Sequence, residues 1–277
     1  MKIIVNADDF GLSHGRNIGV DYCLRNGIAT QGSIIVNSLH TGEAVNMARD
    51  GGYMDKIGLH LNIASGQVMS KSMKTAKDYC KDGVFNVTNP RSLQKVLKIN
   101  NVSELRDEFN AQINSFFSFG FSFKHIDVHC DMLFNRAVLR AIIPLLNKYG
   151  IDSVRGVEPY LFCYYKKRGI QYAPIKYYYK WCFMTKKSLG TSVALHGGRN
   201  INMYYKDKLI LDGGGDNRIG SMKSDGVYEV IIHPLFDGTD FFDTTNLDEV
   251  RNARLLEDTI QKLSGIEKTT YKYLQLI

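Results

Sequence analysis

The stretch KIIVNADDFG, residues 2–11, joins a short apolar run to two adjacent carboxylates, Asp8 and Asp9. The run over residues 2–6 is typical of a buried strand, and the Phe-Gly pair that follows the acids is typical of a turn. We therefore expect a strand that ends at the two acids. Two neighbouring negative charges at the end of a buried strand are unusual and require a physical reason.

The size and composition of the chain predict one domain over residues 1–277. It has 277 residues and a mass of 31.4 kDa, with 44% hydrophobic and 23% charged residues, which is ordinary globular composition. No apolar run approaches the roughly 20 residues that span a bilayer, and the first residues lack the sections of a signal peptide. We therefore expect a soluble, cytoplasmic protein with no membrane partner.

The cysteines and the charge add two further expectations. Five scattered cysteines without a CxxC spacing predict reduced thiols. The net charge of +7 arises largely from basic residues within 166–187, and no nucleic-acid-binding signature accompanies them. We expect a solvated basic lobe and no nucleic acid partner, while an acidic partner and a homo-oligomer both stay open.

Apolar runs and helical patterns alternate along most of the chain. Strands are predicted at 33–36, 57–62, 124–128, 153–155 and 227–232, and helices at 15–26, 42–49, 105–117, 138–149 and 246–263. Such alternation predicts βαβ units and a parallel sheet. A closed barrel and an open doubly wound sheet both fit, although no GxGxxG follows the first strand to favour a dinucleotide fold.

Two long stretches interrupt this alternation, residues 64–100 and roughly 160–226. Long irregular insertions in a compact α/β domain usually form lids or the walls of binding sites. We expect that role for both stretches.

Polar side chains follow several of the predicted strands: Asp8, Asp9, His60, His129, Arg155 and His233. In parallel sheets, ligands bind at the carboxyl ends of the strands, where the loops converge. We therefore expect these side chains to meet at one rim of the sheet.

The stretch KHIDVHC, residues 124–130, has a polar residue at every second position. Residues two apart on a strand share a face, so His125, Asp127 and His129 should point the same way. One interpretation places this row inside the fold, satisfied by a metal, water or a hydrogen-bonded network, with Asp127 or His125 holding the ring of a metal-binding His129. The other places it on an exposed edge strand, and both stay open.

Each of these polar residues has an ordinary explanation when taken alone. His60 fits a core or a turn, the paired acids fit a helix N-terminus, and His233 fits a turn before proline. Together they favour a divalent metal site made of one carboxylate and two imidazoles. The second carboxylate is then free to take a proton from water, which would explain two adjacent acids.

Four motifs resemble one known family, the YdjC-like carbohydrate deacetylases, which include chitooligosaccharide deacetylase. They are NADDFGLS at 6–13, GLHLN at 58–62, HIDVH at 125–129 and HP at 233–234, and the closing TTYKYLQL resembles the family's last strand. The resemblance implies an α/β fold, a distorted (β/α) TIM-like barrel with lid-like insertions. It also implies one divalent metal ion, magnesium or zinc, and removal of acetyl groups from N-acetylated amino sugars.

The resemblance also assigns roles to individual residues. The implied metal ligands are Asp9, His60 and His129. Asp8 would be the general base, and His233 the general acid that protonates the leaving amine. Arg155 would orient Asp8 or contact the acetyl group, with an ordinary surface arginine as the alternative.

The chain departs from the family pattern at three places. Cys130 and Asp131 stand where the family often has further histidines, and Leu235-Phe236 follows His233-Pro234 where glycine is usual. His196 lies in a stretch that does not align clearly; it either enters the site or has a structural role, and we favour the structural role. These departures affect the predicted substrate more than the predicted reaction.

The resulting hypothesis is a metal-dependent hydrolase that releases acetate from an N-acetylated amino sugar or a short oligosaccharide. Aromatic residues within 177–181 would stack on the sugar or form a plain apolar wall. Two alternatives stay open. Another metal hydrolase on the same barrel, such as a phosphoesterase, requires a second carboxylate-rich metal site. A catalytically altered carbohydrate-binding or regulatory protein requires no second metal site.

Overall fold

The computed structural model describes residues 2–76, 79–85, 102–122, 124–134, 136–151, 153–155, 194–196, 202–205, 227–243 and 254–271. The strands are β1 (Lys2–Phe10), β2 (Gln31–Ile34), β3 (Ile57–Leu61), β4 (Cys80–Lys81), β5 (Val84–Phe85), β6 (His125–Val128), β7 (Ser153–Arg155), β8 (Ala194–His196), β9 (Asn202–Tyr205), β10 (Val227–Ile232), β11 (Pro234–Phe236), β12 (Phe241–Asp243), β13 (Arg254–Leu255) and β14 (Glu267–Lys268). The helices are α1 (His14–Arg25), α2 (Thr41–Asp50), α3 (Lys71–Lys74), α5 (Val102–Ser118), α6 (Arg136–Tyr149) and α11 (Leu256–Leu263), with 3-10 turns η1 (Met54–Lys56) and η2 (His129–Phe134).

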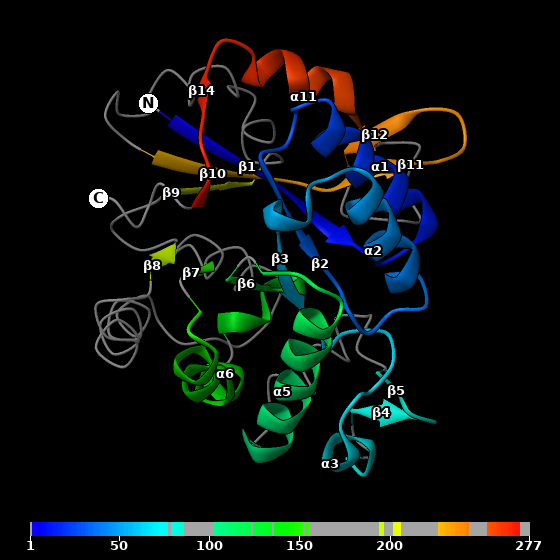
Figure 1. The fold of residues 1–277 in the computed structure, drawn as a ribbon, viewed down its shortest axis with the longest axis vertical. Helices are drawn as coiled ribbons and strands as arrows, with labels where there is room; N and C mark the ends of the chain where they lie inside the picture. The colour runs from blue at the N-terminus through cyan, green and yellow to red at the C-terminus, as the bar shows by residue number, and fades with distance from the viewer. Residues whose placement is uncertain are drawn as a thin grey trace, which may run out of the picture.

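One parallel sheet organises the molecule. Its strands follow the order β8-β7-β6-β3-β2-β1-β10-β9, and β14 pairs with the beginning of β1. β1 therefore lies in the interior of the sheet, between β2 and β10 (Figure 1). Because the neighbouring strands run parallel, their carboxyl ends share one side of the sheet, as the sequence predicts.

The sheet is a curled half-barrel. Among the described strands no pairing joins β8 to β9, so the α/β fold and its parallel sheet are confirmed, whereas a complete TIM barrel is not shown. Every pair along the path from β8 to β9 is parallel, and helices such as α1, α2 and α6 connect consecutive strands. The curled parallel sheet of the described residues is consistent with the expected distorted barrel.

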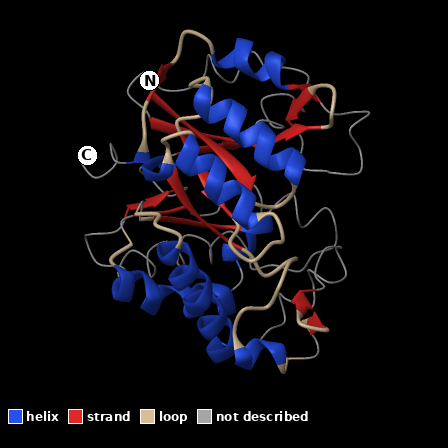
Figure 2. Ribbon diagram, turned by 45° about the vertical axis from the view of Figure 1, so that its right-hand side comes forward, coloured by secondary structure: helices blue, strands red, loops and turns tan. Residues whose placement is uncertain are grey.

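Helices cover the sheet, and their apolar faces supply the core (Figure 2). α5 shows how the sequence does this, because Leu105, Phe109 and Ile113 recur every four residues and are all buried. The fourth member of the predicted stripe, Phe117, is half-buried, and its neighbour Phe116 is buried instead.

Two predicted segments differ from the structure, and others lie outside the described residues. Of the helix expected at 246–263 the structure describes only residues 254–263, and there α11 begins at Leu256, because Arg254–Leu255 pair with β12 as β13. The stretch 160–226 contains β8 and β9, so parts of it belong to the main sheet and not to a lid. Residues 177–181 and the basic residues within 166–187 lie outside the described residues.

Two smaller expectations concern membranes and thiols. None of the described helices has the length and the apolar composition needed to cross a bilayer. Cys23, Cys80 and Cys130 are free thiols, as expected, while Cys163 and Cys182 lie outside the described residues.

A tight contact between α1 and β11 fixes the chain next to His233. A Cβ atom built on Gly19 would lie 2.7 Å from the carbonyl carbon of Pro234, and one on Gly15 would lie 2.3 Å from the carbonyl oxygen of Phe236. Between these glycines, the buried Arg16 donates from Nη1 to the carbonyl oxygens of His233 and Pro234. Glycine at both positions lets the helix approach closely enough for this contact.

We expect Gly19→Ala to lower the free energy of unfolding by about 1–3 kcal/mol, because the added methyl group meets backbone atoms that cannot rotate away. The matched control is Gly42→Ala in α2, where nothing lies within 4 Å of the added Cβ. That control should be neutral or more stable by up to about 1 kcal/mol. Urea unfolding compares the two, and equal stability changes would contradict the proposed close contact.

Candidate functional site

A β-bulge in β1 brings the two neighbouring acids to one side. Ala7 pairs with Gly32 and Phe10 with Ile34, so Asp8 and Asp9 together oppose one residue of β2. Asp9 adopts a left-handed conformation, with φ of 69°. Successive residues of a regular strand face opposite sides, and an inserted residue re-aims a side chain. β1 extends through the acids to Phe10, one residue beyond the expected end of the strand.

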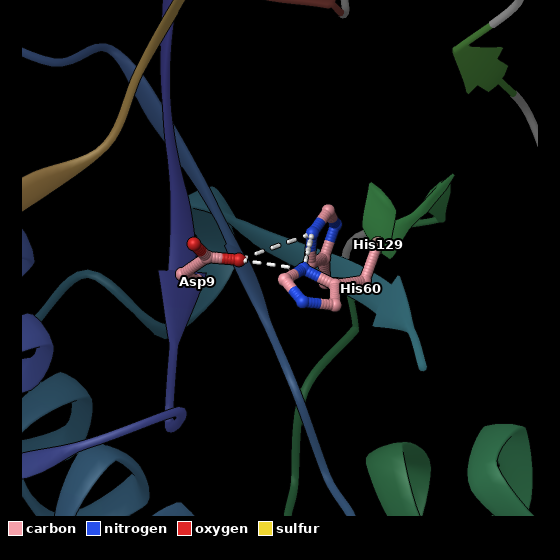
Figure 3. Close-up of side chains that lie close together, drawn as sticks. All are labelled: Asp9, His60 and His129. Atoms are coloured by element: carbon pink, nitrogen blue, oxygen red, sulfur yellow. Dashed lines mark hydrogen bonds and ion pairs between the residues drawn. The ribbon is translucent and has the colours of Figure 1, made fainter. Parts of the chain in front are cut away.

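Three side chains from different strands converge on one point (Figure 3). Asp9 Oδ1 lies 3.4 Å from His60 Nε2 and 2.9 Å from His129 Nδ1. The two imidazole nitrogens are 3.3 Å apart. Asp9 comes from β1, His60 from β3 and His129 from the residue after β6, so the predicted convergence of strand ends is present.

These donors fit a metal ion. A cation bonded at about 2.1 Å to three such atoms separates them by about 3.0 Å at octahedral angles and about 3.4 Å at tetrahedral angles. The observed separations span this range. Asp9 Oδ1 is buried, and no described residue gives it a hydrogen bond of suitable geometry, which leaves its lone pairs for a cation.

Asp127 orients His60. Its Oδ1 lies 2.5 Å from His60 Nδ1, so the proton of the neutral ring stays on Nδ1 and the lone pair of Nε2 faces Asp9. The sequence predicted such a supporting carboxylate for His129. The structure assigns Asp127 to His60 instead, because His60 and Asp127 are register partners on the adjacent strands β3 and β6.

The polar row of β6 is buried. His125 and Asp127 have no exposed surface, and β6 lies between β3 and β7, so the edge-strand interpretation is wrong. His125 Nδ1 lies 2.7 Å from Ser153 Oγ, and a Cβ on Gly58 of β3 would lie 3.0 Å from the His125 ring. Asp127 and His125 therefore serve an internal polar network.

Arg155 links three buried carboxylates. Its Nη1 and Nη2 donate to the two carboxylate oxygens of Asp8 at 2.6 and 2.8 Å. Nη2 also lies 2.9 Å from Asp127 Oδ2, and Nε donates to Glu229 at 2.7 Å. Arg155 is only 5% exposed, so the interpretation as a surface arginine is wrong. Its contacts agree with the expectation that it orients Asp8.

A second group of candidate ligands, Asp8, His60 and Asp127, overlaps the first. Arg155 already binds both oxygens of Asp8 and Oδ2 of Asp127, and the remaining oxygen of Asp127 contacts His60 Nδ1. The geometry of the described residues therefore supports one cation at this place and not two.

Buried negative charge is in excess around these donors. Five buried carboxylates lie in this region: Asp8, Asp9, Asp127, Glu229 and Asp243. Two buried guanidinium groups, of Arg16 and Arg155, oppose them. A divalent cation would offset most of the excess, and without such charge a buried carboxylate is costly.

The pKa values of the donors reflect this charge. Burial lowers the pKa of His60, but the charge and hydrogen bond of Asp127 outweigh burial and raise it to about 10. Burial raises the pKa of Asp9, but the charge and close contacts of His129 and His60 outweigh burial and hold it well below its usual range. The site therefore attracts protons or a cation, and a cation that binds displaces the protons.

Asp8 lies between the donor cluster and His233. Asp8 Oδ2 is 3.9 Å from His60 Nε2 and 4.0 Å from His233 Nε2. Asn6 Nδ2 and Ser33 Oγ donate to Asp8 Oδ1, at 2.6 and 3.3 Å, so this oxygen faces away from the cluster. All six predicted site residues are thus brought together.

The sequence did not reveal several supporting residues: Asn6, Arg16, Ser33, Glu229 and Tyr271. Glu229 and Arg16 carried a readable signal, since a charged residue in the middle of an apolar strand or helix is exceptional. His196 is the register partner of Arg155, and its side chain lies outside the described residues.

A family model described as YdjC-like protein matches residues 2–262. The chain belongs to the YdjC-like family. This membership confirms the resemblance of the four sequence motifs, and each of the predicted site residues falls within the matched range.

Curated relatives of this YdjC-like chain are named carbohydrate deacetylase. One from Clostridium beijerinckii is 32% identical over 151 residues, which is 54% of this chain and 58% of the relative. One from Thermoanaerobacter pseudethanolicus is 33% identical over 152 residues, with the same coverage of 54% and 58%. One from Danio rerio is 32% identical over 168 residues, 59% of this chain and 52% of the relative. The aligned region thus spans little more than half the length of these relatives.

A solved structure from Enterococcus faecalis V583 shares the fold of this YdjC-like chain. Its TM-score is 0.65 at 22% identity, and the alignment covers 99% of this chain and 98% of the other. Its description names cellobiose-phosphate cleavage. At this identity the likeness concerns the fold alone.

We expect Asp9→Asn to weaken the binding of a divalent cation at least about 100-fold, since even partners outside the ligand set contribute about 10- to 100-fold. Asparagine tolerates the left-handed conformation of residue 9, so the fold should persist. Calorimetric titration with Zn²⁺ or Mn²⁺ measures the affinity. Asp237→Asn, at an exposed loop position, is the matched control. Parent-like affinity in Asp9→Asn would contradict the assigned site.

Proposed function

We propose that this chain is a metal-dependent carbohydrate deacetylase that hydrolyses the N-acetyl group of an amino sugar or a short oligosaccharide. The observation that carries the proposal is the convergence of Asp9, His60 and His129, with Asp8 held beside them by Arg155. Family membership and the name carbohydrate deacetylase among the relatives supply the reaction class.

Asp9, His60 and His129 would hold one divalent cation. Such a cation lowers the pKa of water and polarises a carbonyl oxygen, and it stabilises the negative charge that develops there. The proposed metal is magnesium or zinc. Two imidazole ligands are favoured by zinc, cobalt, nickel and manganese.

Asp8 is assigned the role of general base. Both of its oxygens accept hydrogen bonds from Arg155, and Oδ2 also faces His60 and His233. Asp8 would take a proton from water as the water oxygen bonds to the acetyl carbon. The bidentate contact with Arg155 fixes the orientation of the Asp8 carboxylate.

His233 is assigned the role of general acid. Its backbone N–H donates to Asp243 Oδ1 at 3.0 Å, and its carbonyl oxygen accepts from the buried Arg16, so the backbone of this residue is held on both sides. Its side chain is partly exposed beside Asp8. His233 would donate a proton to the amide nitrogen as the C–N bond breaks, and acetate and the sugar ammonium would be the products.

The first test is restoration of activity by metal. We expect the metal-stripped protein to release no acetate from N-acetylglucosamine oligomers, and one of Zn²⁺, Mg²⁺, Mn²⁺ or Co²⁺ to restore release. An enzymatic acetate assay measures the product. Asp9→Asn is the control that should not respond to the restored ion. No acetate from any acetylated sugar with any ion would contradict the proposed function.

The second test separates a catalyst from a binding protein. We expect Asp8→Asn to lower kcat by about 10²- to 10⁴-fold, because general-base catalysis is worth that much, while metal binding is retained. Steady-state acetate release and cation titration measure the two properties, with Asp237→Asn as control. A carbohydrate-binding protein without turnover would show no rate to lose, and sugar binding would be unchanged by the substitution.

A further inference from the structure

Two buried residues of the later chain form a hydrogen-bonded chain that ends at Arg155 Nε. Glu229 of β10 accepts a hydrogen bond from Arg155 Nε at 2.7 Å, and the hydroxyl of Tyr271 donates to the same oxygen, Oε1. Glu229 has no exposed surface and Tyr271 is 1% exposed. Neither residue is a candidate metal ligand or one of the assigned proton-transfer residues, so the roles assigned above leave both without a function.

The guanidinium of Arg155 has a fixed fork of donors, and each edge of it is occupied. Nε faces Glu229, while Nη1 and Nη2 face Asp8 and Nη2 also meets Asp127. Because the fork is planar and rigid, the position of one edge decides the position of the others. Holding Nε therefore sets where the two hydrogen bonds to Asp8 point.

We propose that Glu229 and Tyr271 are positioning residues that hold Arg155 and, through it, Asp8 in the orientation needed for proton transfer. The inference rests on the proposed function, since it assigns these residues to the same reaction. Tyr271 holds Glu229 by a hydrogen bond, and Glu229 in turn holds Nε of Arg155. The Nη1 and Nη2 groups of the same guanidinium then hold Asp8.

The surroundings of Tyr271 support a fixed donor. Its ring stacks on His125, with centroids 3.9 Å apart and an angle of 13° between the planes. Burial, followed by the charge of Glu229, raises the pKa of Tyr271 well above its ordinary value, so the hydroxyl keeps its proton and donates. His125 belongs to the buried row of β6, which also carries Asp127. Tyr271 is thus locked against the same strand that supports His60.

The central variant is Tyr271→Phe, which removes the hydroxyl and keeps the ring. We expect kcat to fall by about 10-fold, the lower end of what supporting hydrogen bonds contribute, with KM within about twofold. If the effect passes through Asp8, then adding Tyr271→Phe to Asp8→Asn should cause no further loss of kcat. Glu229→Gln should give the same pattern.

Tyr53→Phe is the matched control. Tyr53 is 2% exposed and its hydroxyl also contacts a carboxylate, Oδ1 of Asp21, but it lies in the segment between α2 and η1 and touches none of the site residues described above. It should lose a similar amount of stability and keep the parent kcat. An equal fall of kcat in Tyr53→Phe and Tyr271→Phe would overturn the proposal, because general loosening would then explain both.

A second readout does not depend on turnover. The Arg155 Nε–H proton gives an NMR signal that can be assigned by its absence in Arg155→Lys. We expect Tyr271→Phe to shift this signal and speed its exchange with water about 10-fold, and Tyr53→Phe to leave it unchanged. An unchanged signal in Tyr271→Phe would overturn the proposal. If the parent protein releases no acetate but the signal responds as expected, the deacetylase proposal falls while the anchoring of Arg155 stands.

Discussion

The site depends on one irregularity of the backbone, the bulge at Asp8 and Asp9. A regular strand would direct these neighbours to opposite faces, and one acid would then be buried in the apolar core beside Ala7 or Phe10. The inserted residue and the left-handed conformation of Asp9 aim both at the same region. Strained backbone of this kind costs of order 1–3 kcal/mol, and it persists because β2 and β10 hold β1 on both sides.

Once both acids face inward, the surrounding charges follow from the cost of burying them. Asp8 is neutralised by Arg155, and Asp9 lies 3.9 Å from Arg16 while contacting two imidazoles. Arg155 in turn requires several acceptors, which Asp127 and Glu229 provide. Removing one member of such a buried network typically costs about 3–5 kcal/mol, because the remaining charge is left uncompensated.

Much of this arrangement was readable from the sequence. The parallel sheet and the convergence of its polar strand ends follow from periodicity and motif positions. The roles of the six site residues came from the family resemblance. The bulge was not predictable, because Asp9 gives no sign of its left-handed conformation. The partner of Asp127 was also missed, since which histidine it supports depends on the register between β3 and β6. The role of Tyr271 could not be predicted from any sequence pattern, because only the tertiary fold brings it to Glu229.

The central place of β1 has a consequence for biosynthesis. Lys2 pairs with Val227, so β1 finds its neighbour β10 only after more than two hundred further residues have been made. At about 5–20 residues per second, this delay amounts to roughly 10–45 seconds. During that time one edge of an apolar strand stays unpaired, and such edges promote aggregation. The edge of β1 that later pairs with β10 is therefore a site where nascent chains can aggregate until β10 has been made.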